Sequence, residues 1–365
     1  MKVLLVDLEM VWRGGQNQAL LILKGLQARG HSADIVAARG SQLGENAAAS
    51  GIRVHSVSRG LMWLPAAAKI RELVSHERFD LVHANEAHAV TAVWLARAHK
   101  HVPFLISRRV GYPLGKSRLA RARYEAAARI IANSQWVADQ AAASGAQREK
   151  LTVVYEGAEI PPRFTIEQKQ AARARWGIED DNPVLGCVGV LLPDKGQEWL
   201  IRALAELRKD FAGLKLLLAG DGPCQKQLEA LARELGIYEA VIFAGFVKDV
   251  ESVYAALDVF LLPSLFEALN NSLLAAMAYE IPSIAFRRGA LGEIIEDGKS
   301  GLLTSAADTD ELCAAVRTLL RDHALAKLLG EAGRRRVRKC FSAERMVDSI
   351  VCVYEEALKP LRMKR

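Results

Sequence analysis

A single carboxylate, Glu267, stands between an apolar run and a helical stretch that opens at Asn270, Asn271 and Ser272. The first turn of a helix leaves backbone N–H groups without intrahelical partners and carries partial positive charge. Such a turn is a natural seat for a diphosphate. A carboxylate beside it can accept hydrogen bonds from sugar hydroxyls. The arrangement predicts a site for a nucleotide sugar, and the alternative is an acidic turn before a buried helix.

Two further groups bear on the same chemistry. Lys195 follows an apolar run at the start of a helical stretch, where its ammonium can neutralise a leaving diphosphate as charge develops. The alternative for Lys195 is a solvated surface lysine. Asp308-Thr309-Asp310 has the spacing of a manganese ligand pair, but it begins a helical stretch, where acids act as caps. We therefore predict no metal site.

The composition is that of a globular protein with about two domains. The 365 residues are 51% hydrophobic and 25% charged. The five cysteines have no metal-ligand spacing, which predicts ordinary thiols in a reducing compartment. Acids at Asp7 and Glu9 favour a first strand over a signal peptide, and no uncharged apolar run reaches the about 18 residues that span a bilayer. These features predict a cytoplasmic location.

The charge is uneven along the chain. Residues 1–163 contain 22 lysines and arginines against 13 acids, whereas the remainder contains 27 against 29. A basic first half predicts an anionic partner, such as phospholipid headgroups, a phosphorylated acceptor or nucleic acid. Residues 116–128 predict a basic helix that suits an anionic membrane surface, or else a solvated face. The basic run 334–339 has no interleaved aromatic residues, so we predict solvated surface and no nucleic-acid binding.

Short apolar runs alternate with helical stretches throughout, which predicts parallel sheets covered by helices on both faces. The Pro/Gly-rich segment 156–162 predicts a linker. We expect an α/β fold of two Rossmann-like domains facing across a cleft, with ligands at the carboxyl ends of the strands. The expected domains are residues 1–160 and 161–341, and a terminal helix in 342–365 packs back on the first. Strands are expected at 2–6, 33–37, 53–56, 81–84, 104–107, 130–133, 152–155, 184–188, 215–219, 241–244, 259–262, 283–286 and 301–304.

Two common nucleotide motifs are missing from the sequence. No Gly-x-Gly-x-x-Gly follows the first strand, which argues against an ordinary dinucleotide oxidoreductase. No GxxxxGK[ST] occurs, which argues against a P-loop enzyme.

Several other motifs occur in an order and spacing that identify a family. They are Arg13-Gly14-Gly15, Ile131-Ala132-Asn133-Ser134, the segments 188–196, 218–223, 243–247 and 258–264, Glu267, and Ala276-Met277-Ala278. With these motifs the chain resembles the GT-B-fold retaining glycosyltransferases of family 4, the group 1 transferases. The resemblance covers nearly the whole chain.

The resemblance implies roles for particular residues. Lys195 and Glu267 would be the catalytic pair, because Glu267 matches the first glutamate of the family's E-x7-E motif. The implied donor contacts are Gly14, Gly15, Gly189, Gly220, Phe246, Val247, Asn270, Asn271 and Ser272. The expected acceptor contacts are Arg108, Arg109, Tyr112, His83 and Glu86, with a structural histidine as the alternative for His83. No cofactor and no metal are implied, since the nucleotide-diphosphate sugar is a substrate.

The chain also departs from the family pattern. Ala275 occupies the place of the second glutamate of E-x7-E, and Val190 that of an arginine near the phosphates. Glu156 stands where asparagine is usual, and the family's cleft histidine is missing. Losing two charge-assisted contacts would remove about 1.5–3 kcal/mol each unless Arg108 or Arg109 compensates.

The expected function is transfer of a hexose-type sugar from a nucleotide-diphosphate donor to a cell-envelope glycolipid or polysaccharide acceptor of the lipopolysaccharide type. The resemblance implies front-face attack with retention, in which the protein supplies positioning and electrostatics. Peripheral contact with an anionic membrane surface is also expected. The alternatives are a nucleotide-sugar 2-epimerase and a degenerate, non-catalytic GT-B binding module.

Overall fold

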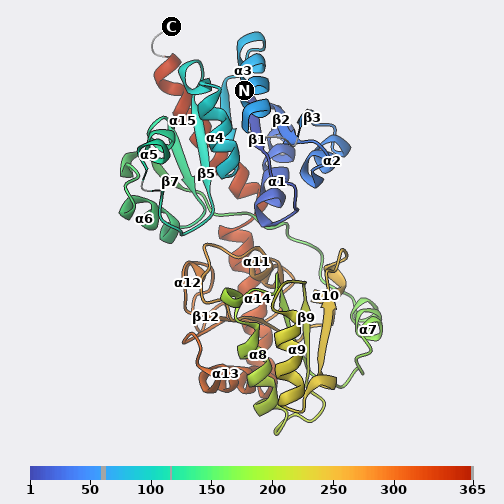
Figure 1. The fold of residues 1–365 in the computed structure, drawn as a ribbon. Coiled ribbons are helices and arrows are strands. Elements are labelled where there is room, and N and C mark those ends of the chain that lie inside the picture. Colours follow the sequence, from blue (N-terminus) through green and yellow to red (C-terminus); the bar gives the residue numbers. More distant parts are fainter. Residues whose placement is uncertain (59–62, 116, 363–365) are drawn as a thin grey trace. The chain divides into compact units, whose positions relative to one another are not determined.

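The structure is a computed structural model that describes residues 1–58, 63–115 and 117–362 (Figure 1). The chain divides into two compact units. Unit 1 comprises Met1–Gly157 and Phe341–Arg365, and unit 2 comprises Ala158–Cys340. The break between them falls inside the Pro/Gly-rich segment 156–162.

Unit 1 is built on a seven-stranded parallel sheet in the order β3-β2-β1-β4-β5-β6-β7. Its strands are β1 (Lys2–Asp7), β2 (Ser32–Ala38), β3 (Arg53–Val57), β4 (Leu81–Ala84), β5 (Phe104–Arg108), β6 (Arg129–Ala132) and β7 (Leu151–Val153). Its helices are α1 (Gly14–Ala28), α2 (Gln42–Ala49), α3 (Trp63–His76), α4 (Ala87–Leu95), α5 (Arg118–Glu125), α6 (Gln135–Ala143) and α15 (Ala343–Arg362).

The two faces of this sheet bury different helices because side chains alternate along each strand. Val3 and Leu5 of β1 join a core with α1, α2 and α15. Leu4 and Val6 join a second core with α3 and α4. A strand buried on both faces has a continuous apolar run, which is the pattern that residues 3–6 show.

Unit 2 is built on a six-stranded parallel sheet in the order β10-β9-β8-β11-β12-β13. Its strands are β8 (Val184–Val188), β9 (Lys215–Ala219), β10 (Val241–Gly245), β11 (Val259–Leu262), β12 (Ser283–Phe286) and β13 (Leu302–Thr304). Its helices are α7 (Ile166–Arg175), α8 (Gln197–Leu207), α9 (Gln225–Glu234), α10 (Glu251–Ala256), α11 (Asn271–Ala278), α12 (Leu291–Ile294), α13 (Thr309–Arg321) and α14 (His323–Cys340).

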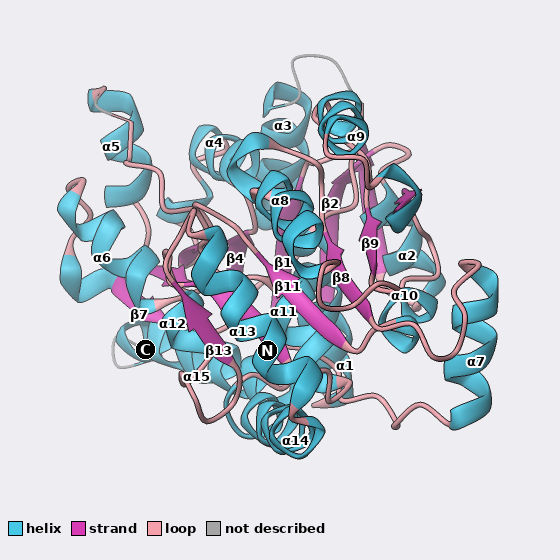
Figure 2. Cartoon of the chain, turned by 90° about the horizontal axis from the view of Figure 1, so that it is seen from below, coloured by secondary structure: helices cyan, strands magenta, loops and turns pink. Residues whose placement is uncertain are grey.

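Both sheets are flanked by helices in the way that alternating strands and helices predict (Figure 2). In each sheet the strand order reverses beside the first strand of the unit, β1 in unit 1 and β8 in unit 2. Ligands bind at such switch points, beyond the carboxyl ends of the strands. The predicted α/β fold class is therefore confirmed, and the edges that follow β1 and β8 are where a site is expected.

Helix α15 completes unit 1 although it is the last element of the chain. Its residues Ile350, Tyr354 and Leu358 belong to the same core as β1 and α1. Tyr354 is fully buried and hydrogen-bonds to the ring of His83 on β4, with 2.7 Å between the hydroxyl oxygen and Nδ1.

The two basic runs differ from the sequence prediction. Helix α5 spans Arg118–Glu125, shorter than the 116–128 expected, and Lys116 lies outside the described residues. In the second run, Arg334 is mostly buried and donates to the carbonyl oxygens of Ala278 and Pro161. The prediction of a fully solvated run was wrong there, because a guanidinium can satisfy carbonyls that end a neighbouring helix. Among the described residues, we find no helix whose length and apolar character would let it cross a membrane.

Candidate active site

The carboxyl edge of the unit 2 sheet holds the predicted catalytic pair. Lys195 ends a short 3₁₀ turn, Pro193–Lys195, that follows β8, and Glu267 lies between β11 and α11. The Lys195 Nζ atom is 2.7 Å from Glu267 Oε2. The lysine side chain is 24% exposed and the glutamate side chain 10%. The structure thus forms an ion pair that is sheltered but still reached by solvent.

One glycine allows these two segments to meet. Gly196 has φ of 69°, and a Cβ there would lie 2.2 Å from the carbonyl oxygen of Pro263. Of the amino acids, only glycine tolerates both a left-handed backbone and so close an approach by another backbone atom, because it lacks a Cβ. The backbone N–H of Leu265 also donates to the Asp194 carbonyl at 2.8 Å. These contacts fix the lysine turn against the loop that carries Glu267.

The first turn of α11 adjoins the ion pair. Asn270 is the N-cap, and its Oδ1 accepts from the backbone N–H of Leu273 at 2.8 Å. Its Nδ2 donates to Glu267 Oε2 at 3.0 Å. Ser272 Oγ donates to the carbonyl of Val188, the last residue of β8, at 2.8 Å. The cap therefore joins the carboxylate, the helix and the end of β8 in one network.

The other donor residues predicted in unit 2 lie along the same edge. Gly189 and Gly220 follow β8 and β9, and a Cβ on Gly220 would lie 2.0 Å from the Gly189 carbonyl oxygen. Gly220 has φ of 143°, so this close approach also requires glycine. Phe246 follows β10 and is 71% exposed, and Val247 is half-buried. Asn271 is half-buried as the first residue of α11.

The matching edge of the unit 1 sheet holds a buried polar network. Asp7, at the end of β1, accepts hydrogen bonds from Gln16 Nε2 at 3.0 Å and Asn85 Nδ2 at 2.6 Å. Arg109 donates to the Asn85 carbonyl at 2.8 Å, and its Nε lies 2.9 Å from Glu156 Oε1. Burial is the main reason that the pKa of Asp7 is raised above its ordinary value.

Glu86, one of the predicted acceptor contacts, is the N-cap of α4. Its carboxylate accepts hydrogen bonds from the backbone N–H groups of Leu8, His88 and Ala89. Burial, with a smaller contribution from the charge of Asp7, raises the pKa of Glu86 to about 7. Glu9, Glu86 and His88 form the one group of three ligating side chains within 4.8 Å that occurs in the described part of the chain. Because the Glu86 carboxylate already accepts three backbone hydrogen bonds, it has little capacity left to ligate a metal ion.

Known proteins match both units. The family model described as "Glycosyltransferase Family 4" matches residues 12–160, and "Glycosyl transferases group 1" matches residues 182–322. The D-inositol 3-phosphate glycosyltransferase of Geodermatophilus obscurus is 33% identical over 322 residues, covering 81% of this chain and 71% of that protein. The chain belongs to glycosyltransferase family 4. Transfer of a glycosyl group is the activity for which that relative is named.

Two further proteins are similar to this family 4 chain. The GDP-mannose-dependent alpha-(1-6)-phosphatidylinositol monomannoside mannosyltransferase of Mycolicibacterium smegmatis is 29% identical, over 88% of this chain and 90% of that one. The crystal structure of Anabaena HepE in complex with UDP and glucose aligns with a TM-score of 0.84 at 24% identity, over 96% and 98% of the two chains. This structural similarity shows that the family 4 chain has the GT-B fold.

Two predicted acceptor contacts of the family 4 chain need correction. His83 is fully buried, and its ring nitrogens lie 2.7 Å from Tyr354 Oη and 2.8 Å from Ser107 Oγ. Burial lowers the pKa of His83 to about 3, so the ring is neutral and structural. Arg108 is 7% exposed and donates to the Tyr112 carbonyl and, at 3.1 Å, to Tyr124 Oη.

The other predicted contacts in unit 1 remain open to ligands to different degrees. Tyr112 is 58% exposed, and the side chain of Arg109 is partly exposed beside Glu156. Gly14 and Gly15 form the first turn of α1. A Cβ on Gly15 would meet Arg109 Cδ at 3.7 Å, an ordinary contact, so packing within the described residues does not demand glycine there.

Sequence reasoning missed Asp7, the centre of the unit 1 network. Asp7 ends β1 and Asn85 follows the neighbouring strand β4, and the two strands meet at the switch point of the sheet. That adjacency was the available signal, because polar residues at the carboxyl ends of paired parallel strands share one edge. Glu156 was noted only as a departure from the family pattern, whereas it is the ion-pair partner of Arg109.

Proposed function

We propose that this family 4 transferase moves a hexose-type sugar, with retention of configuration, from a nucleoside-diphosphate donor to a cell-envelope glycolipid or polysaccharide precursor of the lipopolysaccharide type. The observation that carries the proposal is the ion pair of Lys195 and Glu267 beside the N-cap of α11. This ion pair joins a cation, a carboxylate and a helix N-terminus at the carboxyl edge of the sheet.

The ion pair suits a donor because each partner can exchange the other for a ligand group. The ammonium of Lys195 would turn to the diphosphate, whose negative charge grows as the bond to the sugar breaks. Glu267 would then accept hydrogen bonds from sugar hydroxyls. Its Oε1 receives no hydrogen bond from any other described residue, so one oxygen is available before the ion pair opens. The first turn of α11 would add backbone N–H groups and positive potential.

The relatives support the proposed substrates. One relative is named for GDP-mannose and a phosphatidylinositol monomannoside, and one structural neighbour holds UDP and glucose. Both names contain a nucleoside diphosphate, which is the part that the α11 site would recognise. The first relative acts on a glycolipid, which is the acceptor class we propose. In unit 1, Arg109 and Tyr112 are two of the predicted acceptor residues that solvent reaches.

In the proposed mechanism the acceptor hydroxyl attacks on the face from which the diphosphate leaves. The departing phosphate takes the proton, and the protein contributes position and charge. Lys195 and the α11 turn would fill the charge role of a divalent ion, so we propose that no metal is required. We also propose a cytoplasmic enzyme at the membrane surface, where the basic residues of α5 would face anionic lipid.

Thermal denaturation with a panel of nucleoside diphosphates and nucleotide sugars tests the proposal. A ligand present at 100 times its Kd stabilises the folded state by about 2.7 kcal/mol. We expect at least one nucleoside diphosphate to raise the Tm at millimolar concentration, and the rise to be lost in Lys195→Ala. The matched control is Lys226→Ala, which removes an exposed lysine from α9. If every nucleotide leaves the Tm unchanged, the donor site is wrong.

The second candidate is a non-catalytic GT-B module, favoured by Val190 and Ala275 in place of a phosphate-binding arginine and a second glutamate. Val190 is 40% exposed, and Ala275 is half-buried on α11. Release of nucleoside diphosphate on addition of a glycolipid would distinguish the candidates. A transferase releases it in proportion to glycolipid consumed, whereas a module binds the nucleotide without turnover.

A further inference from the structure

One cavity of unit 2 lies away from the proposed donor site. It has a volume of about 640 Å³, in the range of small-molecule sites. Its lining includes Pro183, Asp258 and Pro282, which precede β8, β11 and β12. It therefore opens at the amino edge of the sheet, whereas Lys195 and Glu267 lie at the carboxyl edge. The proposed transfer reaction does not use this cavity.

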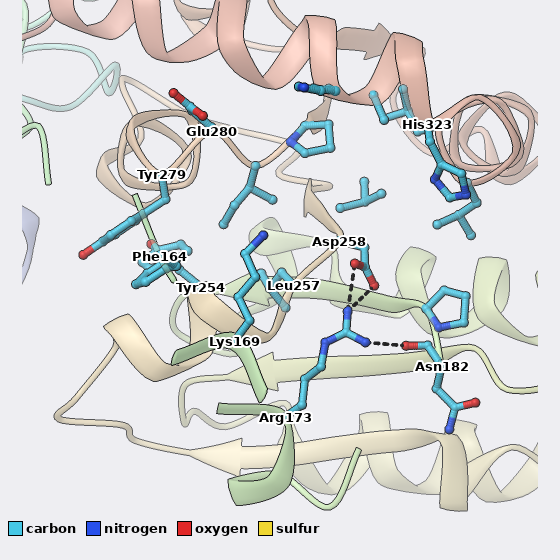
Figure 3. A pocket seen from close by; sticks show the side chains of 18 of the residues that line it. Phe164, Lys169, Arg173, Asn182, Tyr254, Leu257, Asp258, Tyr279, Glu280 and His323 are labelled. Carbon is cyan, nitrogen blue, oxygen red and sulfur yellow. Dashed lines mark hydrogen bonds and ion pairs between the residues drawn. The ribbon is translucent and has the colours of Figure 1, made fainter. Parts of the chain in front are cut away.

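The chemistry of the lining favours an anion with an apolar body. Leu257, Ile281 and Pro282 supply an apolar surface, and Lys169 reaches in from α7 (Figure 3). Lys327 lines the cavity from α14. Neither ammonium group has a hydrogen-bond or ion-pair partner among the described residues, and both lysines are exposed to solvent.

The acids of the cavity are largely engaged. Asp258 receives two hydrogen bonds from Arg173, at 2.8 and 2.7 Å, and Glu280 pairs with Arg163 at 2.9 Å (Figure 3). Glu331 lies 3.8 Å from Arg335, whereas Asp180 and Asp181 are exposed to solvent and have no ion-pair partner among the described residues. Lys169 and Lys327 are likewise the lysines of the lining whose ammonium groups hold no carboxylate, and they are the groups that would hold an anion against the apolar surface.

One residue connects this cavity to the proposed donor site. Tyr254 lines the cavity, and its hydroxyl donates to the carbonyl of Ser272 at 3.1 Å, in the first turn of α11. Its ring contacts that of Tyr279, with centroids 5.5 Å apart, and Tyr279 stacks on Phe164 at 4.4 Å. Tyr279 is the C-cap of α11. Both ends of α11 are thus tied to the cavity wall.

We propose that this cavity binds a small organic phosphate and that its occupancy changes nucleotide affinity at the opposite end of α11. The phosphate would lie between Lys169 and Lys327, and the organic part against Leu257 and Pro282. A ligand that shifts Tyr254 or Tyr279 would shift the helix whose first turn forms the donor site. By thermodynamic linkage, each ligand then changes the affinity of the other by the same factor. This second half rests on the proposed nucleotide site.

Phenyl phosphate is the probe, because it combines an aromatic body with a phosphate and lacks a nucleoside. Titration calorimetry on the full chain should give saturable binding with Kd of about 1 mM, the scale for so small a ligand. Phenol and inorganic phosphate, each lacking one half, should bind at least tenfold more weakly. The double variant Lys169→Ala, Lys327→Ala should weaken phenyl phosphate binding at least tenfold, and the control Lys226→Ala should not.

Two outcomes overturn the site. One is the absence of saturation at about 20 mM, twenty times the expected Kd. The other is binding that Lys195→Ala abolishes while the double variant leaves it unchanged, since phenyl phosphate would then occupy the donor edge. Neither outcome requires nucleotide binding, so failure of the donor site and failure of this cavity are separable.

The coupling is tested with whichever nucleoside diphosphate stabilises the chain. Saturating phenyl phosphate should change its Kd at least threefold, and the nucleotide should change the Kd of phenyl phosphate by the same factor. Tyr254→Phe keeps the ring and removes the bond to Ser272, so it should abolish the coupling and retain phenyl phosphate binding. Tyr279→Leu interrupts the ring contact and is the second variant if Tyr254→Phe does not fold. Unchanged affinities in the wild-type chain would overturn the coupling.

Discussion

The carboxyl edges of the two sheets differ in how they hold their carboxylates. In unit 2, Glu267 is bonded by two side chains, Lys195 and Asn270, both at Oε2. In unit 1, Glu86 holds three backbone N–H groups, and Asp7 holds the amides of Gln16 and Asn85. A lysine side chain can rotate to a ligand, whereas a backbone N–H is held in place by the chain around it. We call the Lys195–Glu267 pair the exchangeable edge of unit 2 and the network of Asp7 and Glu86 the fixed edge of unit 1, which excludes the ion pair of Arg109 and Glu156.

The largest expected effect follows from breaking the exchangeable edge. Glu267→Ala and Lys195→Ala should each reduce turnover by at least about 10², the scale for losing one preorganised charged contact. The measurement is steady-state release of nucleoside diphosphate from the donor. Lys226→Ala, on the surface of α9, is the control and should retain full turnover. Wild-type rates in either site variant would mean that the exchangeable edge is not where transfer occurs.

The Glu86 carboxyl group, at the fixed edge, should make the free energy of unfolding depend on pH. The pKa of Glu86 is raised from 4.5 to about 7 in the folded chain. Between these values the folded state keeps a proton that the unfolded state has lost, so the free energy of unfolding falls as pH rises. The shift corresponds to about 3 kcal/mol across this window. In Glu86→Gln this pH-dependent loss should be absent.

Urea unfolding from pH 4.5 to pH 8 measures the effect. The comparison uses the difference between wild type and Glu86→Gln at each pH, which removes the contributions of groups that titrate alike in both. The amide replaces one carboxylate oxygen by a donor, so a constant offset is expected as well. Glu125→Gln on α5 is the exposed control. A constant difference over the whole range would contradict a raised pKa at Glu86.

A smaller effect should come from the buried histidine of the unit 1 sheet. Tyr354→Phe removes the hydroxyl that lies 2.7 Å from His83 Nδ1 and leaves that nitrogen without this partner in the core. An unsatisfied buried polar group costs about 1–3 kcal/mol. The free energy of unfolding should fall by that amount, and Tyr238→Phe, at a half-buried site where the hydroxyl bonds to no described residue, should leave it unchanged. A loss below about 0.5 kcal/mol would show that α15 does not depend on this bond.

The comparison also explains which parts of the molecule the sequence could predict. The strands at 184–188 and 259–262 were predicted with the bounds that the structure has, because a continuous apolar run between two helical stretches indicates a buried parallel strand. The family resemblance singled out Lys195 and Glu267 together as the catalytic residues, and the structure places Nζ 2.7 Å from Oε2. The local chemistry of either residue would not have placed them together.

The unit 1 edge was harder to predict for a physical reason. Whether His83 faces the core or a ligand depends on Tyr354, which lies 271 positions away in the chain. Arg108 and Arg109 are adjacent basic residues, yet the first is buried against Tyr124 and the second pairs with Glu156. Residue type identifies groups that can do chemistry. Long-range packing decides which of these groups are buried and bonded to other side chains, and which stay available to a ligand.

The smallest expected effect concerns a carboxylate that resembles Glu267 in sequence only. Asp308 also stands just before a helix, but it is the N-cap of α13 and accepts from the backbone N–H of Glu311 at 2.9 Å. Asp308→Ala should therefore lower the free energy of unfolding by about 1 kcal/mol through the lost cap. Nucleotide affinity should be unchanged, and millimolar Mn²⁺ should shift the Tm of wild type and variant equally. A wild-type Tm that rises with Mn²⁺ only while Asp308 is present would make 308–310 a metal site, and the capping interpretation would then be wrong.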